Sequence, residues 1–374
     1  MTAQVTPYRL IISGGGTGGH IFPALAIANE FRHRHPSSEI LFVGAKGRME
    51  MSRVPEAGYQ IVGLWISGLQ RSLKISNLLF PIKLLVSYLK ASGIVKKFRP
   101  HAVIGTGGYA SGPVMLAAIR QGIPTLIQEQ NSFAGLTNRK IAGKVNAICV
   151  AYDGMTQYFP SSKVRFTGNP VRKNISSSLI SREQAVRGFG FDPSKKTVLV
   201  VGGSLGALTL NQVISDGLSI FSQHQIQVIW QTGKRYFTEM SAKLKANGTK
   251  LVKAVEFISS VDEAYAAADV VVSRAGALAI SELCLVGKPV ILVPSPNVAD
   301  DHQTKNAMSL ADRSAAVMIP DKDAATRLIP AILDLVADNN RKQQLSANIR
   351  FLGRPDATAD IVNEIEKLVE TQIQ

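Results

Sequence analysis

The chain has 374 residues, of which 45% are hydrophobic, and a formal net charge of +15 at pH 7. This length suits two domains with separate cores rather than one. The two cysteines, Cys149 and Cys284, stand far apart without C-x-x-C spacing, which argues against a disulfide framework or a zinc site and fits a reducing cytosol. The apolar stretches are short or broken by glycine, so we expect neither a signal peptide nor a transmembrane helix.

Strands and helices alternate through the first half of the chain. Apolar runs predict strands at 8–12, 40–43, 61–65, 102–105, 124–128 and 147–151, with helices at 22–34, 77–97, 111–121 and 135–143. This alternation is typical of an α/β fold with a doubly wound parallel sheet. In such sheets ligands bind beyond the carboxyl ends of the strands.

A glycine-rich stretch, Ser13-Gly-Gly-Gly-Thr-Gly-Gly-His20, follows the first predicted strand. Its backbone can approach a phosphate closely, and the next helix presents free N–H groups. Gly14, Gly16 and Gly19 satisfy G-x-G-x-x-G, but that dinucleotide fingerprint also needs an acidic residue after the second strand, and residues 44–47 contain none. We therefore expect a phosphate-bearing ligand other than NAD.

The positive charge is concentrated in the first half. Residues 1–170 contain 19 Lys and Arg against 6 Asp and Glu, whereas residues 171–374 contain 23 against 21. No acidic residue occurs between Ala57 and Gln128. A one-sided charge of this kind indicates a polyanionic partner, either nucleic acid or an anionic membrane surface.

The segment from Arg71 to Arg99 combines seven basic residues with an apolar helical face formed by Leu78, Ile82, Leu85 and Leu89. A basic amphipathic helix of this kind indicates binding to a membrane surface. The alternative is a helix that faces the core with a solvated basic side. The apolar run at 78–81 favours the membrane, and the scarcity of aromatic residues argues against nucleic acid.

A second glycine-rich stretch, 105–113, follows the fourth predicted strand, and it is either a further ligand loop or a tight connection. After a polar break at 167–178 the strand–glycine–helix pattern restarts at 197–208. Further strands are predicted at 226–230, 251–255, 270–273, 290–293 and 316–319. The chain therefore reads as two similar Rossmann-type halves.

Two stretches of the second half carry candidate ligand-binding residues. Residues 273–282 run from a strand through a glycine turn into a helix, so the turn can hold a phosphate and Glu282 a ribose hydroxyl. Residues 294–306 are expected to form a loop carrying Asp300, Asp301, His302, Gln303 and Asn306. Without further information, a capped and solvated loop is the commoner interpretation of this stretch.

Together these stretches resemble glycosyltransferase family 28, and within it the UDP-GlcNAc:lipid I N-acetylglucosaminyltransferases. Seven ordered motifs over most of the chain carry the resemblance. They are Gly15–His20 with Pro23, Gly107–Tyr109 with Ser111–Pro113, Glu129–Asn131 with Ala134–Asn138, Gly168–Arg172, Gly202–Ala207, Ser273–Ala277 with Glu282, and Asp301–Gln303 with Asn306.

The resemblance implies a GT-B fold, in which two Rossmann-like domains face a cleft. Residues 1–170 with a returning helix at 356–374 would form the acceptor and membrane-docking domain, and residues 171–355 the UDP-GlcNAc-binding domain. The reaction would transfer GlcNAc, with inversion, to the C4 hydroxyl of MurNAc in undecaprenyl-diphosphate-MurNAc-pentapeptide (lipid I), giving lipid II for peptidoglycan synthesis. The implied location is peripheral, on the cytoplasmic face of the inner membrane.

The same resemblance implies roles for individual residues. His20 would be the general base or would orient the acceptor, since imidazole titrates near neutral pH; alternatively, it only binds phosphate. Tyr109 would face the lipid diphosphate, and Glu282 would hold the ribose beside Ile258 on the uracil. The other donor-binding residues are Thr17, Gly18, Gly19, Asn131, Arg172, Ser204, Ala277, Leu278, Ala279, Ile280, Ser281 and Gln303.

The membrane-docking residues implied by the resemblance are Lys74, Leu78, Leu79, Phe80, Ile82, Lys83, Leu85 and Lys90. The partners would be UDP-GlcNAc, lipid I, an anionic membrane and other cell-wall synthesis proteins, with no nucleic acid, cofactor or metal. One departure from the family is Leu205, where many relatives carry Gln. Two rival functions stay open, a UDP-GlcNAc 2-epimerase-like enzyme and a non-catalytic nucleotide-sugar binding protein at the membrane surface.

Overall fold

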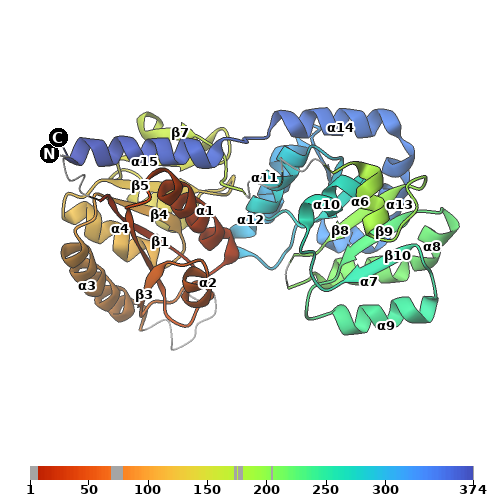
Figure 1. Ribbon diagram of the computed structural model, residues 1–374, viewed down its shortest axis with the longest axis horizontal. Helices are drawn as coiled ribbons and strands as arrows, with labels where there is room; N and C mark the ends of the chain where they lie inside the picture. The colour runs from red at the N-terminus through yellow and green to blue at the C-terminus, as the bar shows by residue number, and fades with distance from the viewer. Residues whose placement is uncertain (1–6, 69–78, 172–174, 176–179, 204, 374) are drawn as a thin grey trace. The chain divides into compact units, whose positions relative to one another are not determined.

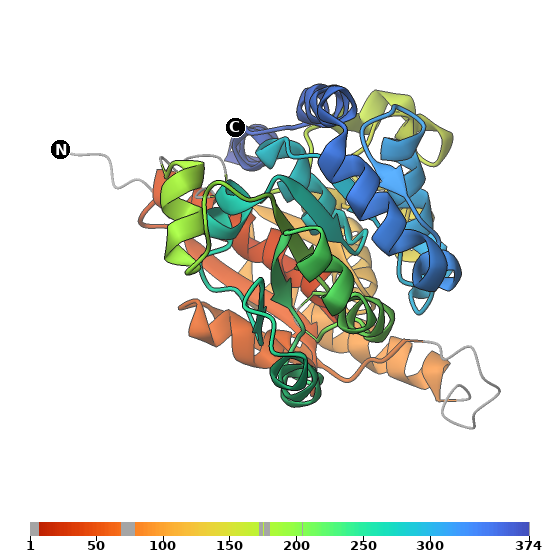
Figure 2. The same ribbon diagram turned by 90° about the vertical axis from the view of Figure 1, so that its right-hand side faces the viewer.

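The structure is a computed structural model that describes residues 7–68, 79–171, 175, 180–203 and 205–373. The chain divides into two compact units, residues 1–171 with 356–374, and residues 172–355 (Figure 1). Each unit is built on a parallel sheet with helices on both faces (Figure 1, Figure 2). The predicted fold class, two doubly wound α/β halves, is confirmed.

The first unit has a seven-stranded sheet in the order β3-β2-β1-β4-β5-β6-β7. Its strands are β1 Arg9–Gly14, β2 Glu39–Ala45, β3 Gln60–Leu64, β4 Ala102–Gly107, β5 Thr125–Glu129, β6 Ala147–Val150 and β7 Val164–Phe166. Its α-helices are α1 Gly18–Arg34, α2 Glu50–Glu56, α3 Phe80–Phe98, α4 Ser111–Arg120, α5 Leu136–Ile141 and α15 Ala357–Ile373. Short 3₁₀ turns occur at Met155–Gln157 and Ser161–Lys163.

Both faces of this sheet are covered because its strands are apolar on both sides. In β1, Leu10 and Ile12 pack with α1, α2 and α15, whereas Ile11 between them packs with α3, α4 and α5. This is the two-sided burial expected of a parallel sheet. It also places α15, the last helix of the chain, beside α1 near its beginning (Figure 1).

The second unit has a six-stranded sheet in the order β10-β9-β8-β11-β12-β13. The strands are β8 Thr197–Val201, β9 Gln227–Gln231, β10 Val252–Val255, β11 Val270–Ser273, β12 Val290–Leu292 and β13 Val317–Met318. The helices are α6 Arg182–Gly188, α7 Leu208–Asp216, α8 Leu218–Gln223, α9 Phe237–Asn247, α10 Val261–Ala267, α11 Ala277–Val286, α12 His302–Ala311, α13 Ala324–Ala337 and α14 Asn339–Phe351, with 3₁₀ turns at Ala299–Asp301 and Asp321–Asp323. This strand order is that of the Rossmann fold.

The predicted strands match the observed ones closely, but the structure corrects several boundaries. Helix α1 begins at Gly18, not at residue 22, so Gly18, Gly19 and His20 form its first turn rather than the end of a loop. Thr17 has the extended backbone of an N-cap residue. The backbone N–H groups of the first turn that follows it have no carbonyl partner one turn earlier in the helix. The loop expected at 294–306 is also shorter than predicted, since α12 begins at His302.

Among the strands and α-helices of the first unit, β7 and α2 were not predicted. Strand β7 is three residues long and pairs only with β6 at the edge of the sheet, so it carries too few residues for a periodic signal. Helix α2 has seven residues with Pro55 inside it and buries only Glu50 and Val54. A short helix that buries a charged residue does not show an amphipathic pattern.

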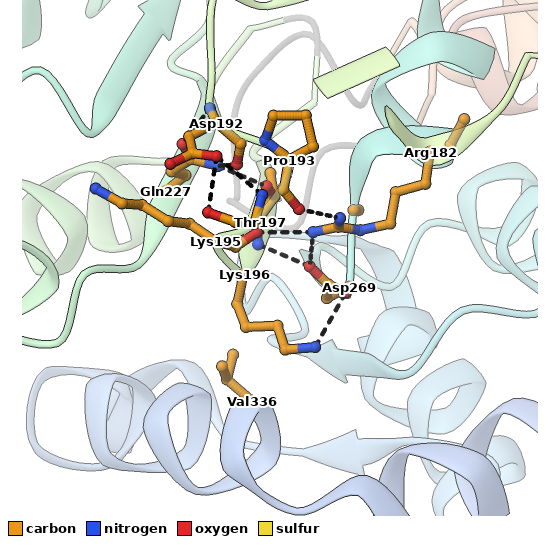
Figure 3. A network of polar contacts seen from close by, with 12 residues as sticks. Arg182, Asp192, Pro193, Lys195, Lys196, Thr197, Gln227, Asp269 and Val336 are labelled. Atoms are coloured by element: carbon orange, nitrogen blue, oxygen red, sulfur yellow. Dashed lines mark hydrogen bonds and ion pairs between the residues drawn. The ribbon is translucent and has the colours of Figure 1, made fainter. Parts of the chain in front are cut away.

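A polar network holds the amino ends of the strands in the second unit, at the edge opposite the glycine loops (Figure 3). Asp269, just before β11, accepts hydrogen bonds from Arg182 Nη2 at 2.6 Å and from the Thr197 N–H at 2.8 Å. Arg182 also donates to the carbonyls of Pro193 and Lys195, each at 2.8 Å. The network joins α6 to the starts of β8 and β11 and supports the sheet rather than the site.

We predict that Asp269→Asn lowers the unfolding free energy of this unit by about 2 kcal/mol, because the amide removes the charge that Arg182 and Thr197 use. The measurement is urea unfolding followed by the fluorescence of buried Trp230 in a Trp65→Phe background. The control is Glu239→Gln, which breaks an exposed ion pair with Lys243 and should cost about 0.5 kcal/mol or less. Equal losses of unfolding free energy in the two variants would contradict the structural role of Asp269.

Candidate active site

In the first unit the glycine loops after β1 and β4 lie against each other, where the strand order reverses. Gly108 has a φ of +83°, and a Cβ atom there would lie 2.2 Å from the Gly15 carbonyl oxygen. A Cβ atom on Gly107 would lie 2.9 Å from the His20 ring. The second glycine stretch is therefore more than a tight connection, because it forms one wall against the first loop and His20.

His20 stands half-buried in the first turn of α1 with a defined ring orientation. Its Nδ1 lies 3.1 Å from the Gly15 carbonyl oxygen and 3.3 Å from Thr17 Oγ1. Since a carbonyl oxygen only accepts, Nδ1 carries the hydrogen, and the lone pair of the neutral ring is on Nε2. Nε2 is directed towards Gly107, where a Cβ atom would be 3.1 Å away. The ring is thus set to accept a proton on Nε2.

Glu50, a residue that the sequence analysis missed, lies fully buried behind the first glycine loop. Its Oε2 accepts the Gly16 N–H at 3.0 Å, and its Oε1 accepts the Ala45 N–H at 2.9 Å. A Cβ atom on Gly15 would lie 2.1 Å from Oε1, so the carboxylate occupies the space that a side chain there would need. The only sequence signal was an isolated acidic residue in a strongly basic half.

A second buried carboxylate, Glu129 at the end of β5, holds the loop that carries Asn131. It accepts the Asn131 N–H at 3.1 Å and, on its other oxygen, the Gly135 N–H at 3.0 Å and Asn138 Nδ2 at 2.8 Å. Gln130, between them, donates to the Thr106 carbonyl on β4 at 2.8 Å. Asn131 is therefore fixed at the same sheet edge as His20.

Tyr109 is half-exposed, and its ring covers Gly68, where a Cβ atom would lie 2.0 Å from Cζ. Gly16 and Thr17 of the first loop are also exposed. The predicted residues Lys74, Leu78, Arg172 and Ser204 lie outside the described residues.

In the second unit the loops after β8 and β9 interlock in a similar way. A Cβ atom on Gly206 would lie 2.1 Å from the Thr232 carbonyl oxygen, and one on Gly233 would lie 2.1 Å from the Gly206 nitrogen. Both glycines have a φ near +80°. Leu205, between the glycines, is 78% exposed and presents an apolar side chain at this edge.

Helix α11 begins directly after β11 and turns its amino end towards this same edge. Gly276 is its extended N-cap residue, and the predicted residues Ala277, Leu278, Ala279, Ile280 and Ser281 form its first turns. The unpaired N–H groups of such a turn attract anions. Glu282, half-buried, follows in the next turn.

Two further predicted residues are held in place by neighbouring polar groups. The Ile258 N–H donates to Gln231 Oε1 at 3.0 Å, and the Ile258 side chain is buried. Gln303 lies on α12 rather than in a loop, and its Oε1 accepts the Ser295 N–H at 2.8 Å. Arg274 ties these loops together, because it donates to the Val293 carbonyl and pairs with Asp321.

Other kinds of site find little support among the described residues. Burial raises the pKa of the Cys284 thiol to about 12 and also raises the pKa of Cys149, so neither is a ready thiolate. Among the residues that the structure describes, no group of three or more His, Cys, Asp or Glu is placed to hold a metal ion.

We predict that Gly108→Ala lowers the unfolding free energy of the first unit by several kcal/mol, because its Cβ atom would collide with the Gly15 carbonyl. The matched control is Gly122→Ala, which has a φ of +71° but no atom within 4 Å of the added Cβ, and should cost about 1–2 kcal/mol. Urea unfolding of both variants measures the difference. Equal costs would mean that backbone conformation alone, not the contact between the loops, requires glycine at 108.

Comparison with known proteins places this site in a family. Residues 10–150 match the N-terminal domain of glycosyltransferase family 28, and residues 197–361 match its C-terminal domain. A relative from Parabacteroides distasonis is 53% identical over 97% of this chain and 99% of its own length. It is named UDP-N-acetylglucosamine--N-acetylmuramyl-(pentapeptide) pyrophosphoryl-undecaprenol N-acetylglucosamine transferase, as is a 53% identical relative from Cytophaga hutchinsonii that covers 98% of this chain and 98% of its own length.

Solved structures agree with this placement. The crystal structure of MurG from Acinetobacter baumannii matches with a TM-score of 0.78 at 28% identity, over 96% of this chain and all of that chain. A UDP-N-acetylglucosamine 2-epimerase matches with a TM-score of 0.62 at 12% identity, over 96% of each chain, which shows a shared fold only. On the family models, the full-length relatives and the two Rossmann-like sheets, the chain belongs to glycosyltransferase family 28.

Proposed function

We propose that this protein transfers GlcNAc from UDP-GlcNAc to the C4 hydroxyl of MurNAc in lipid I, with inversion, to give lipid II for peptidoglycan synthesis. The observation that carries the proposal is the identity of about half the residues, over the whole length, with relatives named for this reaction. The orientation of His20 beside the glycine loops supports it independently.

In this proposal His20 acts on the acceptor. Direct displacement at the anomeric carbon needs a base near the attacking hydroxyl and stabilisation of the departing diphosphate. Nε2 of His20 accepts the proton of the C4 hydroxyl while the oxygen forms the new glycosidic bond and UDP leaves with the electron pair of the broken bond. Thr17, Gly18, Gly19 and Asn131 line the sugar and diphosphate, and Tyr109 faces the lipid diphosphate.

The second unit holds the donor nucleotide in this proposal. The amino end of α11 provides N–H groups for the diphosphate, and Glu282 binds the ribose hydroxyls. The Ile258 N–H is already engaged by Gln231, so uracil would meet the side chain and carbonyl of Ile258. Arg172, Ser204 and Gln303 complete the site, and these groups supply the leaving-group stabilisation without requiring a metal.

The experiment that tests the function is product analysis with radiolabelled UDP-GlcNAc, with and without a short-chain lipid I analogue. We expect labelled disaccharide lipid only when the analogue is present. Release of ManNAc without acceptor would establish an epimerase instead. Tight binding of UDP-GlcNAc with no product under either condition would favour a non-catalytic binding protein.

We predict that His20→Ala lowers kcat by roughly 100- to 10,000-fold, which is the usual contribution of a general base, with a small change in the KM for UDP-GlcNAc. Steady-state transfer to the lipid I analogue measures it. His33→Ala is the matched control, because His33 is an exposed histidine on the same helix. Full transfer by the His20→Ala variant would show that His20 is not the general base and has, at most, a role in phosphate binding.

The outer face of α3 supports the proposed peripheral attachment to the cytoplasmic face of the inner membrane. Ile82, Leu85 and Leu89 are 53%, 59% and 60% exposed and lie on one side of the helix, while the opposite side buries Ser87, Ala91 and Val95. The apolar stripe is therefore not part of the core described here. Within the described ranges the helices are too short or too polar to cross a bilayer.

The lysines of α3 lie at the border of this stripe. Lys83 Nζ donates to Ser67 Oγ at 3.1 Å, just after β3, and Lys90 Nζ donates to the Gly63 carbonyl of β3 at 2.9 Å. Further positive charge stands in the last turn, at Lys96 and Lys97. We infer that the apolar stripe, with Leu79 and Phe80 at its start, enters the interface while the surrounding charge attracts anionic head groups.

We predict that the double change Leu85→Gln and Leu89→Gln weakens binding to vesicles containing phosphatidylglycerol by roughly tenfold or more, because two exposed apolar side chains are lost from the interface. Vesicle sedimentation measures the change. Phe351→Ser, at an 87% exposed position in the second unit, is the control and should bind like the unaltered protein. Undiminished binding by the double variant would remove α3 as the docking surface.

A further inference from the structure

A single peptide group connects the buried carboxylate of Glu50 to the ring of His20. The N–H of Gly16 donates to Glu50 Oε2 at 3.0 Å. The carbonyl of Gly15, which belongs to the same peptide group, accepts from His20 Nδ1 at 3.1 Å. The order of groups is therefore carboxylate, peptide 15–16, imidazole.

The backbone around Glu50 is shaped to receive its side chain. A Cβ atom on Gly15 would lie 2.1 Å from Oε1, and one on Gly44 would lie 2.6 Å from the Glu50 Cγ. Oε1 accepts the Ala45 N–H at 2.9 Å, and Oε2 accepts the Gly16 N–H. Glu50 is fully buried, so both oxygens are committed to backbone donors rather than to water.

This arrangement has an electrostatic consequence for His20. A peptide N–H that donates to a carboxylate polarises its own carbonyl, and hydrogen bonds in such a chain strengthen one another. The Gly15 carbonyl then accepts more strongly from Nδ1–H and stabilises a positive charge on the ring. In catalytic triads a carboxylate has this effect through a direct hydrogen bond to Nδ1–H.

We propose that Glu50 is a positioning residue for His20, which acts through peptide 15–16 to hold the Nδ1–H tautomer and to stabilise the imidazolium formed in the transfer reaction. The inference rests on the proposed function, in which His20 Nε2 takes the proton of the acceptor hydroxyl. The Nδ1 hydrogen stays on the ring and no proton passes to or from Glu50, so a single proton moves, from the hydroxyl oxygen to Nε2.

Other titratable groups near this chain of contacts have their own partners or positions. From the β4 loop, Tyr109 lies over Gly68, and from β5, Glu129 is engaged by Asn131 and its neighbours. On the Glu50 side, Lys46 lies along Gly63. The exposed Arg53 and Glu56 of α2 pair with each other. Glu129 therefore offers a matched comparison, a buried carboxylate in the same unit that bonds a different loop.

The test compares Glu50→Gln with Glu129→Gln and Glu50→Asp. Protein with ¹³C-labelled histidine is titrated by NMR, and His20 is assigned through His20→Gln. We expect the His20 midpoint to move to lower pH in Glu50→Gln, since the charge that favours the imidazolium is gone. The His20 midpoint should not move in Glu129→Gln. In Glu50→Asp, which keeps the charge, it should lie close to its value in the unaltered protein.

Kinetics provide the second readout. Glu50→Gln should lower kcat by about 10- to 100-fold with little change in the KM for UDP-GlcNAc, and move the acidic limb of kcat/KM to lower pH. The position of that limb does not depend on how much of the sample is folded, so poor folding cannot imitate it. An unmoved His20 midpoint in Glu50→Gln, or equal movement in Glu129→Gln, overturns the inference. Absence of transfer by the unaltered protein would instead refute the proposed function. The NMR titration does not require transfer, so it tests the link between Glu50 and His20 separately.

Discussion

The structure of the site depends on one peptide group, between Gly15 and Gly16. Its N–H is held by Glu50, its carbonyl is held by His20, and Gly108 of the neighbouring loop packs directly against that carbonyl. The parallel order of the sheet makes β1 and β4 neighbours, so their loops meet at the switch point. Glycine at 108 allows the two loops to meet without a side chain between them, and glycine at 15 leaves the space that the Glu50 carboxylate occupies.

The two units apply the same architecture to different chemistry. Both have interlocked glycine loops at the carboxyl ends of the central strands. The first unit places ionisable side chains, His20, Glu50 and Glu129, in or behind those loops. The second unit offers a helix amino end, neutral amides such as Gln231 and Gln303, and a carboxylate, Glu282, on α11. In the function proposed above, the first unit transfers the proton and the second binds the nucleotide diphosphate.

Much of the fold and part of the candidate site could be predicted from the sequence, because strands and glycine loops leave strong local signals. Apolar runs located every strand except β7, and the glycine motifs pointed to His20. The sequence could not reveal Glu50, since its role depends on contacts with Gly15 and Gly16, which are distant along the chain. Nor could it decide whether the apolar face of α3 is buried, because periodicity reports that a face exists and not what covers it.

We infer that peptide 15–16 sets the state of His20, and the tautomer of the His20 ring is the most direct measure of this. Long-range ¹H–¹⁵N correlation spectra of ¹⁵N-histidine-labelled protein, above the titration midpoint, distinguish the two neutral forms. We predict a protonated Nδ1 and an unprotonated Nε2 for His20. A ring protonated on Nε2 would contradict it, because Nδ1 could then not donate to Gly15 and Nε2 could not accept the acceptor's proton.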